Sequence, residues 1–225
     1  GIILNFSAVQ HLLTLLILPF FGVLIGIGIL PGYLVFLEIQ EWGAMIGGDY
    51  VVTSLITCIG LGIAYIVGGL GIVIVTGLSG SIFALRGKEG RFPLRSMITI
   101  RWAFALVFHR VALIFLSTIV PSMFSTLYYK MMGLNMGSGV IINTPRINDA
   151  PMITLGDRVV IGGEATINVH LVEQGELVLA PVTIGSGSLI GGGSVIQPGS
   201  KIGKDAIVAS RAVVPKWTVI PDGET

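Results

Sequence analysis

The sequence predicts apolar membrane-spanning α-helices in its N-terminal part, followed by a parallel β-helix built from hexapeptide repeats. Three observations support this fold class. Of the 225 residues, 53% are hydrophobic and only 11% are charged, which is far more apolar than a soluble domain of this length. Nearly all long apolar runs lie before residue 130. From Leu155 onward an aliphatic residue recurs every six positions, a period that fits neither an amphipathic helix nor a hairpin meander.

Charge and cysteine content exclude two other classes of protein. The net charge is +1 and no basic run of five or more residues occurs, so we expect no nucleic-acid partner. The single cysteine, Cys58, lies in an apolar segment and cannot support a disulfide framework. Its surroundings are typical of a small core residue. The lipid bilayer is therefore the partner that composition predicts.

Residues 1–95 contain two long uncharged runs. The first, residues 12–37, exceeds the ~30 Å hydrocarbon core of a bilayer at ~1.5 Å per helical residue. Pro19 and Pro31 are expected to kink it. The second run predicts one span over residues 51–78. Its many glycines indicate close packing between helices, as small residues do in membranes. They are Gly60, Gly62, Gly68, Gly69, Gly71, Gly77 and Gly80.

The charges that flank these spans predict the orientation of the chain in the membrane. Only acidic residues separate the two spans, namely Glu38, Glu41 and Asp49. Basic residues follow the second span, namely Arg86, Lys88, Arg91, Arg95 and Arg101. Because positive charges stay on the cytoplasmic side, both termini and the β-helix are expected in the cytoplasm, where thioester donors are available.

Residues 96–130 allow two interpretations. Arg101, His109 and Arg110 interrupt an apolar stretch, and a third crossing would export the β-helix. We therefore favour an interfacial or re-entrant amphipathic helix, with Trp102 and the tyrosines at 128 and 129 at the membrane boundary. A true span is the alternative.

Residues 131–225 carry the hexapeptide pattern. A small residue follows most of the aliphatic positions by four, and glycine often follows directly, where a turn has no room for a Cβ. Three hexads make one coil, with the aliphatic residue inside. These residues are Leu155, Ile161, Ile167, Ile184, Ile190, Ile196, Ile202, Val208, Val214 and Ile220.

The segments "SGSLIGGGSVI" and "ASRAVVPKWTVI" resemble the left-handed β-helix of hexapeptide acyltransferases, which are trimeric. Longer segments, "TLYYKMMGLNMGSGVIINTP" and "NVHLVEQGELVLAPVTIG", resemble one membrane unit of nonribosomal-peptide-synthetase-like proteins such as ε-poly-lysine synthetase. The resemblance implies transfer of an acyl or aminoacyl group from an acyl-CoA or carrier-protein thioester to an amine or hydroxyl. Because those synthetases join three units in tandem, it also implies a homotrimer and possible contact with a carrier protein.

The hexapeptide pattern is interrupted once, and this interruption predicts the site. Between Ile167 and Ile184 a loop leaves the stack, and it holds the only histidine of the β-helix, His170. Imidazole titrates near the working pH and suits a general base, with Glu173 orienting its other nitrogen. Asn168 could polarise a carbonyl or support the base, but a structural asparagine at a turn of the β-helix is the favoured interpretation. The alternative is that His170 only satisfies a loop hydrogen bond.

Two cations in the last coil, Arg211 and Lys216, would suit the phosphates of a donor, although solvated surface charges often look the same. The triple glycine Gly191 to Gly193 lacks the Lys and Ser or Thr of a phosphate-binding P-loop and is interpreted as a turn. No metal is expected, because the other two histidines lie in the apolar half. Fold alone leaves open a noncatalytic scaffold whose β-helix serves only for trimerisation.

Overall fold

The computed structural model describes the backbone from Phe6 to Thr225 and the side chains from Leu15 onward. The chain divides into two compact units between Thr76 and Gly77. The first unit contains helix α1 (Phe6–Ile46) and most of helix α2 (Tyr50–Phe83), which continues into the second unit. The second unit contains two further helices and all of the β-structure. Apolar helices followed by a parallel β-structure of hexapeptide repeats are the fold class that the sequence predicts.

Helices α1 and α2 contain the two predicted spans, and both are long and apolar enough to cross a membrane. Within the first unit, glycines bring their backbones together. A Cβ on Gly71 would collide with the carbonyl oxygen of Gly28, and one on Gly28 would lie 2.6 Å from the Cα of Ile72. At the turn between the helices, the Asp49 side chain accepts a hydrogen bond from the Val52 amide at 3.0 Å. The close packing expected from the glycines is present.

Residues 96–130 form two helices instead of one. Helix α3 (Met97–Ile119) begins after Ser96, whose hydroxyl accepts from the Thr99 amide, and it too is long and apolar enough to cross a membrane. Helix α4 (Met123–Met131) begins after Ser122, which forms a capping box with Ser125. The chain can start a second helix at Ser122 because that cap satisfies its first free amides.

The tyrosines of α4, which the sequence predicts at a membrane boundary, have no exposed side-chain surface. Tyr128 and Tyr129 are fully buried within the second unit. The Tyr129 hydroxyl donates to the carbonyl of Thr144 at 2.8 Å, which ties α4 to the first coil of the β-helix. A buried phenol needs such a partner, because an unpaired hydroxyl in an apolar core is costly.

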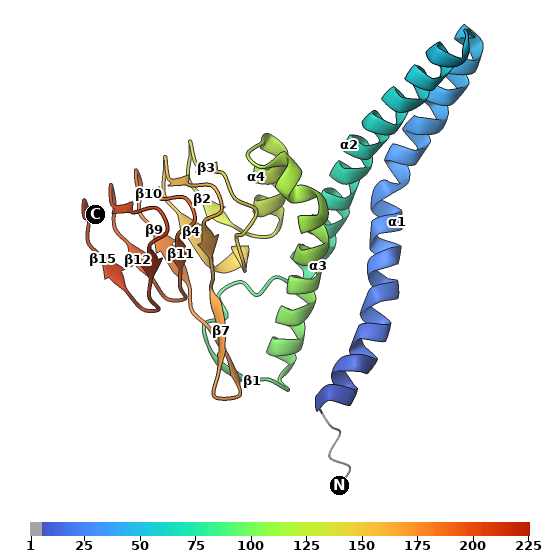
Figure 1. The fold of residues 1–225 in the computed structure, drawn as a ribbon. Coiled ribbons are helices and arrows are strands. Elements are labelled where there is room, and N and C mark those ends of the chain that lie inside the picture. Colours follow the sequence, from blue (N-terminus) through green and yellow to red (C-terminus); the bar gives the residue numbers. More distant parts are fainter. Residues whose placement is uncertain (1–5) are drawn as a thin grey trace. The chain divides into compact units, whose positions relative to one another are not determined.

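The β-helix has three stacked parallel sheets, one for each side of the coil, and Figure 1 shows its levels following one another along the chain. The first sheet contains, in spatial order, β15 (Val219–Ile220), β12 (Lys201–Ile202), β9 (Val182–Ile184), β4 (Ile153–Leu155) and β2 (Asn135–Met136). The second contains β13 (Ile207–Val208), β10 (Leu189–Ile190), β5 (Val160–Ile161) and β3 (Ile141–Ile142). The third contains β14 (Val213–Val214), β11 (Val195–Ile196) and β6 (Thr166–Ile167).

The predicted hexapeptide register is confirmed by the strand pairing. Ile190 lies between Ile161 and Val208 in successive coils, and the aliphatic positions from Leu155 to Val214 are all buried. Where glycine directly follows an inward residue, as at Gly156, Gly162, Gly185, Gly191 and Gly203, it allows the coils to approach. A Cβ on Gly162 would lie 2.6 Å from the amide nitrogen of Gly192 in the next coil. The sequence period therefore sets both the core and the spacing of the coils.

The predicted excursion from the stack is a β-hairpin. Strand β7 (His170–Glu173) pairs antiparallel with β8 (Glu176–Leu179), and the turn residues Gln174 and Gly175 both have positive φ. Strand β1 (Gly90–Pro93), from the segment between α2 and α3, pairs with the other edge of β8. Figure 1 shows β7 and β1 together, projecting from the stack. The hairpin is thus held by a segment that lies far from it in the sequence.

Candidate active site

His170 occupies the first position of β7, where the hairpin leaves the stack. Its Nδ1 lies 2.5 Å from Oδ2 of Asp149, and the two side chains are 22% and 12% exposed. No described residue makes a hydrogen bond to the Nε2 atom. Because Nδ1 is engaged by a carboxylate and part of the ring is open to solvent, Nε2 is the atom available for proton transfer.

Asp149 lies at the turn that precedes the short 3₁₀-helix Ala150–Met152. Its backbone is left-handed, with φ 61° and ψ 48°, a conformation that aspartate tolerates better than most residues. The Met152 amide donates to the Asp149 carbonyl at 3.0 Å, which fixes the turn. The backbone therefore holds the carboxylate in place against the hairpin.

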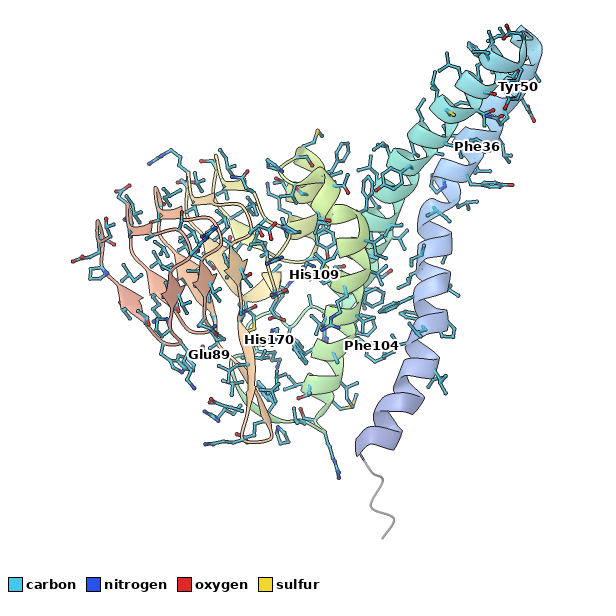
Figure 2. All side chains as sticks on the ribbon, viewed as in Figure 1. Phe36, Tyr50, Glu89, Phe104, His109 and His170 are labelled. Atoms are coloured by element: carbon cyan, nitrogen blue, oxygen red, sulfur yellow. The ribbon has the colours of Figure 1, made fainter. Side chains whose placement is uncertain are left out.

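Trp102 of α3 completes the site. Its Nε1 donates to Oδ1 of Asp149 at 2.8 Å, so both carboxylate oxygens have a partner. The indole also meets the imidazole of His170 edge to face, with ring centroids 4.8 Å apart. In Figure 2, His170 lies at the base of the hairpin, on the side that faces α3. Three separate elements, α3, the turn at Asp149 and β7, thus meet at one imidazole.

This arrangement is competent for general-base chemistry. A carboxylate that accepts from Nδ1–H leaves a lone pair on Nε2 and stabilises the imidazolium that forms when Nε2 takes a proton. The indole covers one side of the ring and limits its rotation. The chemistry that the site can perform is the removal of a proton from a hydroxyl or amine at Nε2.

The structure corrects the partner predicted for His170. Glu173 does not contact the imidazole. Its Oε1 lies 2.5 Å from a guanidinium nitrogen of Arg91, and its Oε2 lies 2.7 Å from Nζ of Lys216. Hydrogen bonds from Lys216 and from Arg91 lower the pKa of the Glu173 carboxyl below its ordinary value. The orienting carboxylate is Asp149, and Glu173 links the hairpin to β1 and to the last coil.

The remaining predicted residues lie apart from the His170 imidazole. Asn168 accepts a hydrogen bond from Nδ2 of Asn148 at 2.7 Å, which joins two coils. Arg211 is exposed at a turn of the last complete coil, and its amide donates to the Gly192 carbonyl at 2.9 Å. Lys216 contacts the hairpin through its ion pair with Glu173. The glycines at 191–193 lie in the turn between β10 and β11, as predicted.

Sequence reasoning missed Asp149 and Trp102. They lie 21 and 47 residues from their bonded partners, His170 and Asp149 respectively. The dipeptide Asn148-Asp149 before a residue pair ending in proline is a turn signal, and that signal was available. No local pattern connects the tryptophan of an apolar helix with a turn in the β-helix.

A small cavity lies behind Asp149, among α3, α4 and the first coil. Its volume is about 30 Å³, and its lining is almost wholly apolar apart from a few polar side chains, which include Asp149 and His109. The space is too small for a coenzyme. Within the part of the chain that the structure describes, no cluster of three or more potential metal ligands occurs.

Comparisons with known proteins concern the β-helix. The family described as "Bacterial transferase hexapeptide (six repeats)" matches residues 181–216, the regular run of hexads after the hairpin. Comparison with curated proteins finds no match.

Three solved structures illustrate the likeness. A hexapeptide-repeat containing acetyltransferase from Vibrio cholerae has 20% identity over 48% of this chain and 78% of its own, with a TM-score of 0.38. A maltose O-acetyltransferase from Clostridium difficile 630 has 16% identity over 65% and 88%, with a TM-score of 0.45. A galactoside acetyltransferase in complex with coenzyme A has 23% identity over 59% and 80%, with a TM-score of 0.41.

Proposed function

We propose that this protein is a membrane-bound acyl or aminoacyl transferase that uses His170 as its general base. The observation that carries the proposal is the His170–Asp149 pair, with Trp102 bonded to the second carboxylate oxygen. A histidine that merely satisfied a loop hydrogen bond would need neither a part-buried carboxylate nor an indole donor from a different element. The hexapeptide transferase match over residues 181–216 supports the same class of chemistry.

The proposed reaction follows from the free Nε2 atom. Nε2 accepts the proton of an acceptor hydroxyl or amine while the acceptor oxygen or nitrogen forms a bond to the thioester carbonyl carbon. Asp149 stabilises the resulting imidazolium. The tetrahedral intermediate then collapses, the C–S bond breaks, and the imidazolium returns the proton to the departing thiolate. The products are an ester or amide and a free thiol.

The donor is proposed to be an acyl-CoA or a carrier-protein thioester. The resemblance to the membrane unit of nonribosomal-peptide-synthetase-like proteins favours an aminoacyl group carried on a carrier protein. Arg211 is exposed and could meet donor phosphates, whereas Lys216 already pairs with Glu173 and would have to exchange that partner. Arg211 is therefore the better candidate for a phosphate contact.

The bilayer is proposed to hold α1 and α2, with the β-helix on the cytoplasmic side. Helix α3 is proposed to lie at the interface, although its length would allow a crossing. Its Trp102 bonds to Asp149, and one side of the helix is buried within the second unit, at Phe108, His109, Val111, Ala112, Phe115 and Leu116. A helix with one buried side and a hydrogen bond to the β-helix is not surrounded by lipid.

A functional test uses the purified full chain in detergent or lipid discs, with release of free thiol from a panel of acyl-CoA donors in the presence of amine and hydroxyl acceptors. We expect His170→Ala to reduce the rate by roughly 10²- to 10⁴-fold. Asp149→Asn should reduce it by about 10- to 100-fold, because a charge-assisted hydrogen bond is lost. Glu173→Gln should retain most activity. An unchanged rate in His170→Ala would remove this residue from the mechanism, and inactivity of the parent with every donor would favour the noncatalytic scaffold.

The assembly is proposed to be a homotrimer, because a short β-helix exposes flat sides that cyclic symmetry can cover. Mass measurement in native-like lipid should give three copies, and a stable monomer would contradict this. Sidedness is tested after replacing Cys58 with Ala. A probe on Asp49→Cys should react from outside the cell and one on Ser186→Cys only from inside.

A further inference from the structure

His109 is a second histidine near Asp149, and one of its ring nitrogens lacks a partner. It lies on α3 with only 6% of its surface exposed. Its Nδ1 lies 2.8 Å from the Tyr128 hydroxyl, and the two rings stack with centroids 5.9 Å apart. Its Nε2 is buried and has no hydrogen-bond partner among the described residues. Leaving such a group unpaired costs about 1–3 kcal/mol, so a partner is expected.

The cavity behind Asp149 offers room for that partner. His109 and Asp149 both line it, and its volume of about 30 Å³ exceeds the ~10–15 Å³ that one water molecule requires. A buried water also needs two or more polar partners. The other polar side chains in the lining are already engaged: Tyr129 with a backbone carbonyl, Trp102 with Asp149 itself, and Tyr128 with Nδ1 of His109. His109 and Asp149 are therefore the two groups that a water molecule would join.

We propose that a buried water bridges His109 Nε2 to the Asp149 carboxylate, which makes His109 a positioning residue that acts on His170 through Asp149. In this arrangement Tyr128 donates its hydroxyl proton to Nδ1 of His109. The Nε2–H group of His109 then donates to the water, and the water donates to the carboxylate. Because it assigns a role in support of the general base, this inference rests on the proposed function.

The bridge has a defined electrostatic consequence for His170. The Asp149 carboxylate would accept hydrogen bonds from Nδ1 of His170, from Nε1 of Trp102 and from the water. Helix α3 carries both Trp102 and His109, the residue that would hold the water. Each added donor spreads the negative charge of the carboxylate and weakens its hold on the imidazolium. Loss of the water should therefore raise the titration midpoint of His170. The other charged groups along the hairpin pair with one another and stay unchanged: Arg91 with Glu173 and Glu176, and Lys216 with Glu173.

The test is an NMR titration of the full chain in detergent micelles with ¹⁵N-labelled histidine. His109→Phe removes both ring nitrogens, whereas His109→Gln keeps an amide N–H close to the position of Nε2. Leu106→Val changes another residue of the cavity wall on the same helix without touching a polar group. Should His109→Phe fail to fold, His109→Leu replaces it.

We expect the His170 midpoint to rise by roughly half a pH unit to one unit in His109→Phe, and to stay at the parent value in His109→Gln and Leu106→Val. In the transferase assay, the acidic limb of the pH–rate profile should move by the same amount only in His109→Phe. An unchanged midpoint in the apolar variants would overturn the inference, as would an equal shift in Leu106→Val. Because the titration needs no substrate, it decides the inference even if the proposed transfer activity is absent.

Discussion

The α1–α2 pair and the β-helix both depend on glycine at close backbone contacts, but different forces hold them together. In the β-helix, Ile161, Ile190 and Ile196 have no exposed surface, so burial of aliphatic side chains drives the stacking and glycine only permits it. In the first unit, large apolar residues such as Leu30 and Leu55 are more than half exposed. In the proposed bilayer location, lipid supplies no hydrophobic drive between these helices, so their association depends on the close contact itself. Glycine thus has a permissive role in the β-helix, where burial of side chains supplies the stability. It has a decisive role between α1 and α2, where the close contact that it allows supplies the stability.

The largest effect should follow from disturbing the driving force of the β-helix. Ile196→Asp would bury a carboxylate between coils and should destabilise the fold by more than about 4 kcal/mol. Lys201→Asp, at an exposed position of the neighbouring strand β12, serves as the control and should change stability little. Thermal unfolding of both variants measures the difference, and an unchanged melting temperature in Ile196→Asp would disprove the hexapeptide register.

The next test addresses the permissive role of glycine in the β-helix. Gly162→Ala should destabilise by about 1–3 kcal/mol, because its Cβ would press on the backbone of the next coil. At Gly163 the nearest atom to a new Cβ is the Asn143 carbonyl oxygen at 3.9 Å. Gly163→Ala should therefore be neutral or stabilise by about 0.4–1 kcal/mol through the unfolded chain. Equal effects of the two adjacent substitutions on the unfolding free energy would contradict the packing described for the coils.

A matching pair tests the decisive role of glycine between α1 and α2. Gly71→Ala should weaken helix pairing by about 1–2 kcal/mol, since its Cβ meets the carbonyl oxygen of Gly28. Gly62→Ala has open space around the new Cβ and should be tolerated or slightly stabilising. Unfolding in mixed micelles with increasing dodecyl sulfate measures both. If Gly62→Ala were the more harmful of the two, the interface would have to lie on another face of α2.

The smallest effect concerns the charged contacts of the hairpin. A carboxyl whose pKa is lowered on folding stabilises the folded state above its unfolded pKa, here about 4.5, and that contribution is lost as the pH falls through the folded pKa. Glu173→Gln should therefore lower the melting temperature by roughly 1–3 °C at pH 7, with the difference vanishing well below pH 4. Glu89→Gln, at a side chain with no ion pair in the described structure, is the control. A difference that persisted unchanged at low pH would exclude Glu173 ionisation as its source.

The β-helix could be predicted in detail because its evidence is local and repeated. Each hexad repeats the same pattern of one inward aliphatic residue. The positions of Ile184, Ile190 and Ile196 therefore fix the stacking without knowledge of any other segment. The excursion at His170 was equally visible as a break in the period. The division of residues 96–130 into two helices was not foreseen, because an apolar stretch gives little sign of where Ser122 caps a new helix.

The site could be predicted only in part. A histidine in a break of a regular pattern is conspicuous, whereas its partner is chosen by three-dimensional proximity. Glu173 is the nearest acidic residue along the chain. Because side chains alternate between the two faces of β7, Glu173 points away from His170, and it pairs with Arg91 and Lys216 instead. Asp149 reaches His170 from the previous coil, a relation that follows from stacking geometry and not from spacing in the sequence.

The pairing of β1 with β8 also fixes an order of events during synthesis. Arg91 and Glu176 lie 85 residues apart, so β1 leaves the ribosome long before the strand that completes it. Helices can form from neighbouring residues at once, whereas this non-local pair must close a long loop, which makes it slow. Until then β1 is an unprotected edge beside an apolar helix, the kind of segment that pairs with the wrong chain. The hairpin that carries His170 is consequently secured against β1 only after β8 has been synthesised.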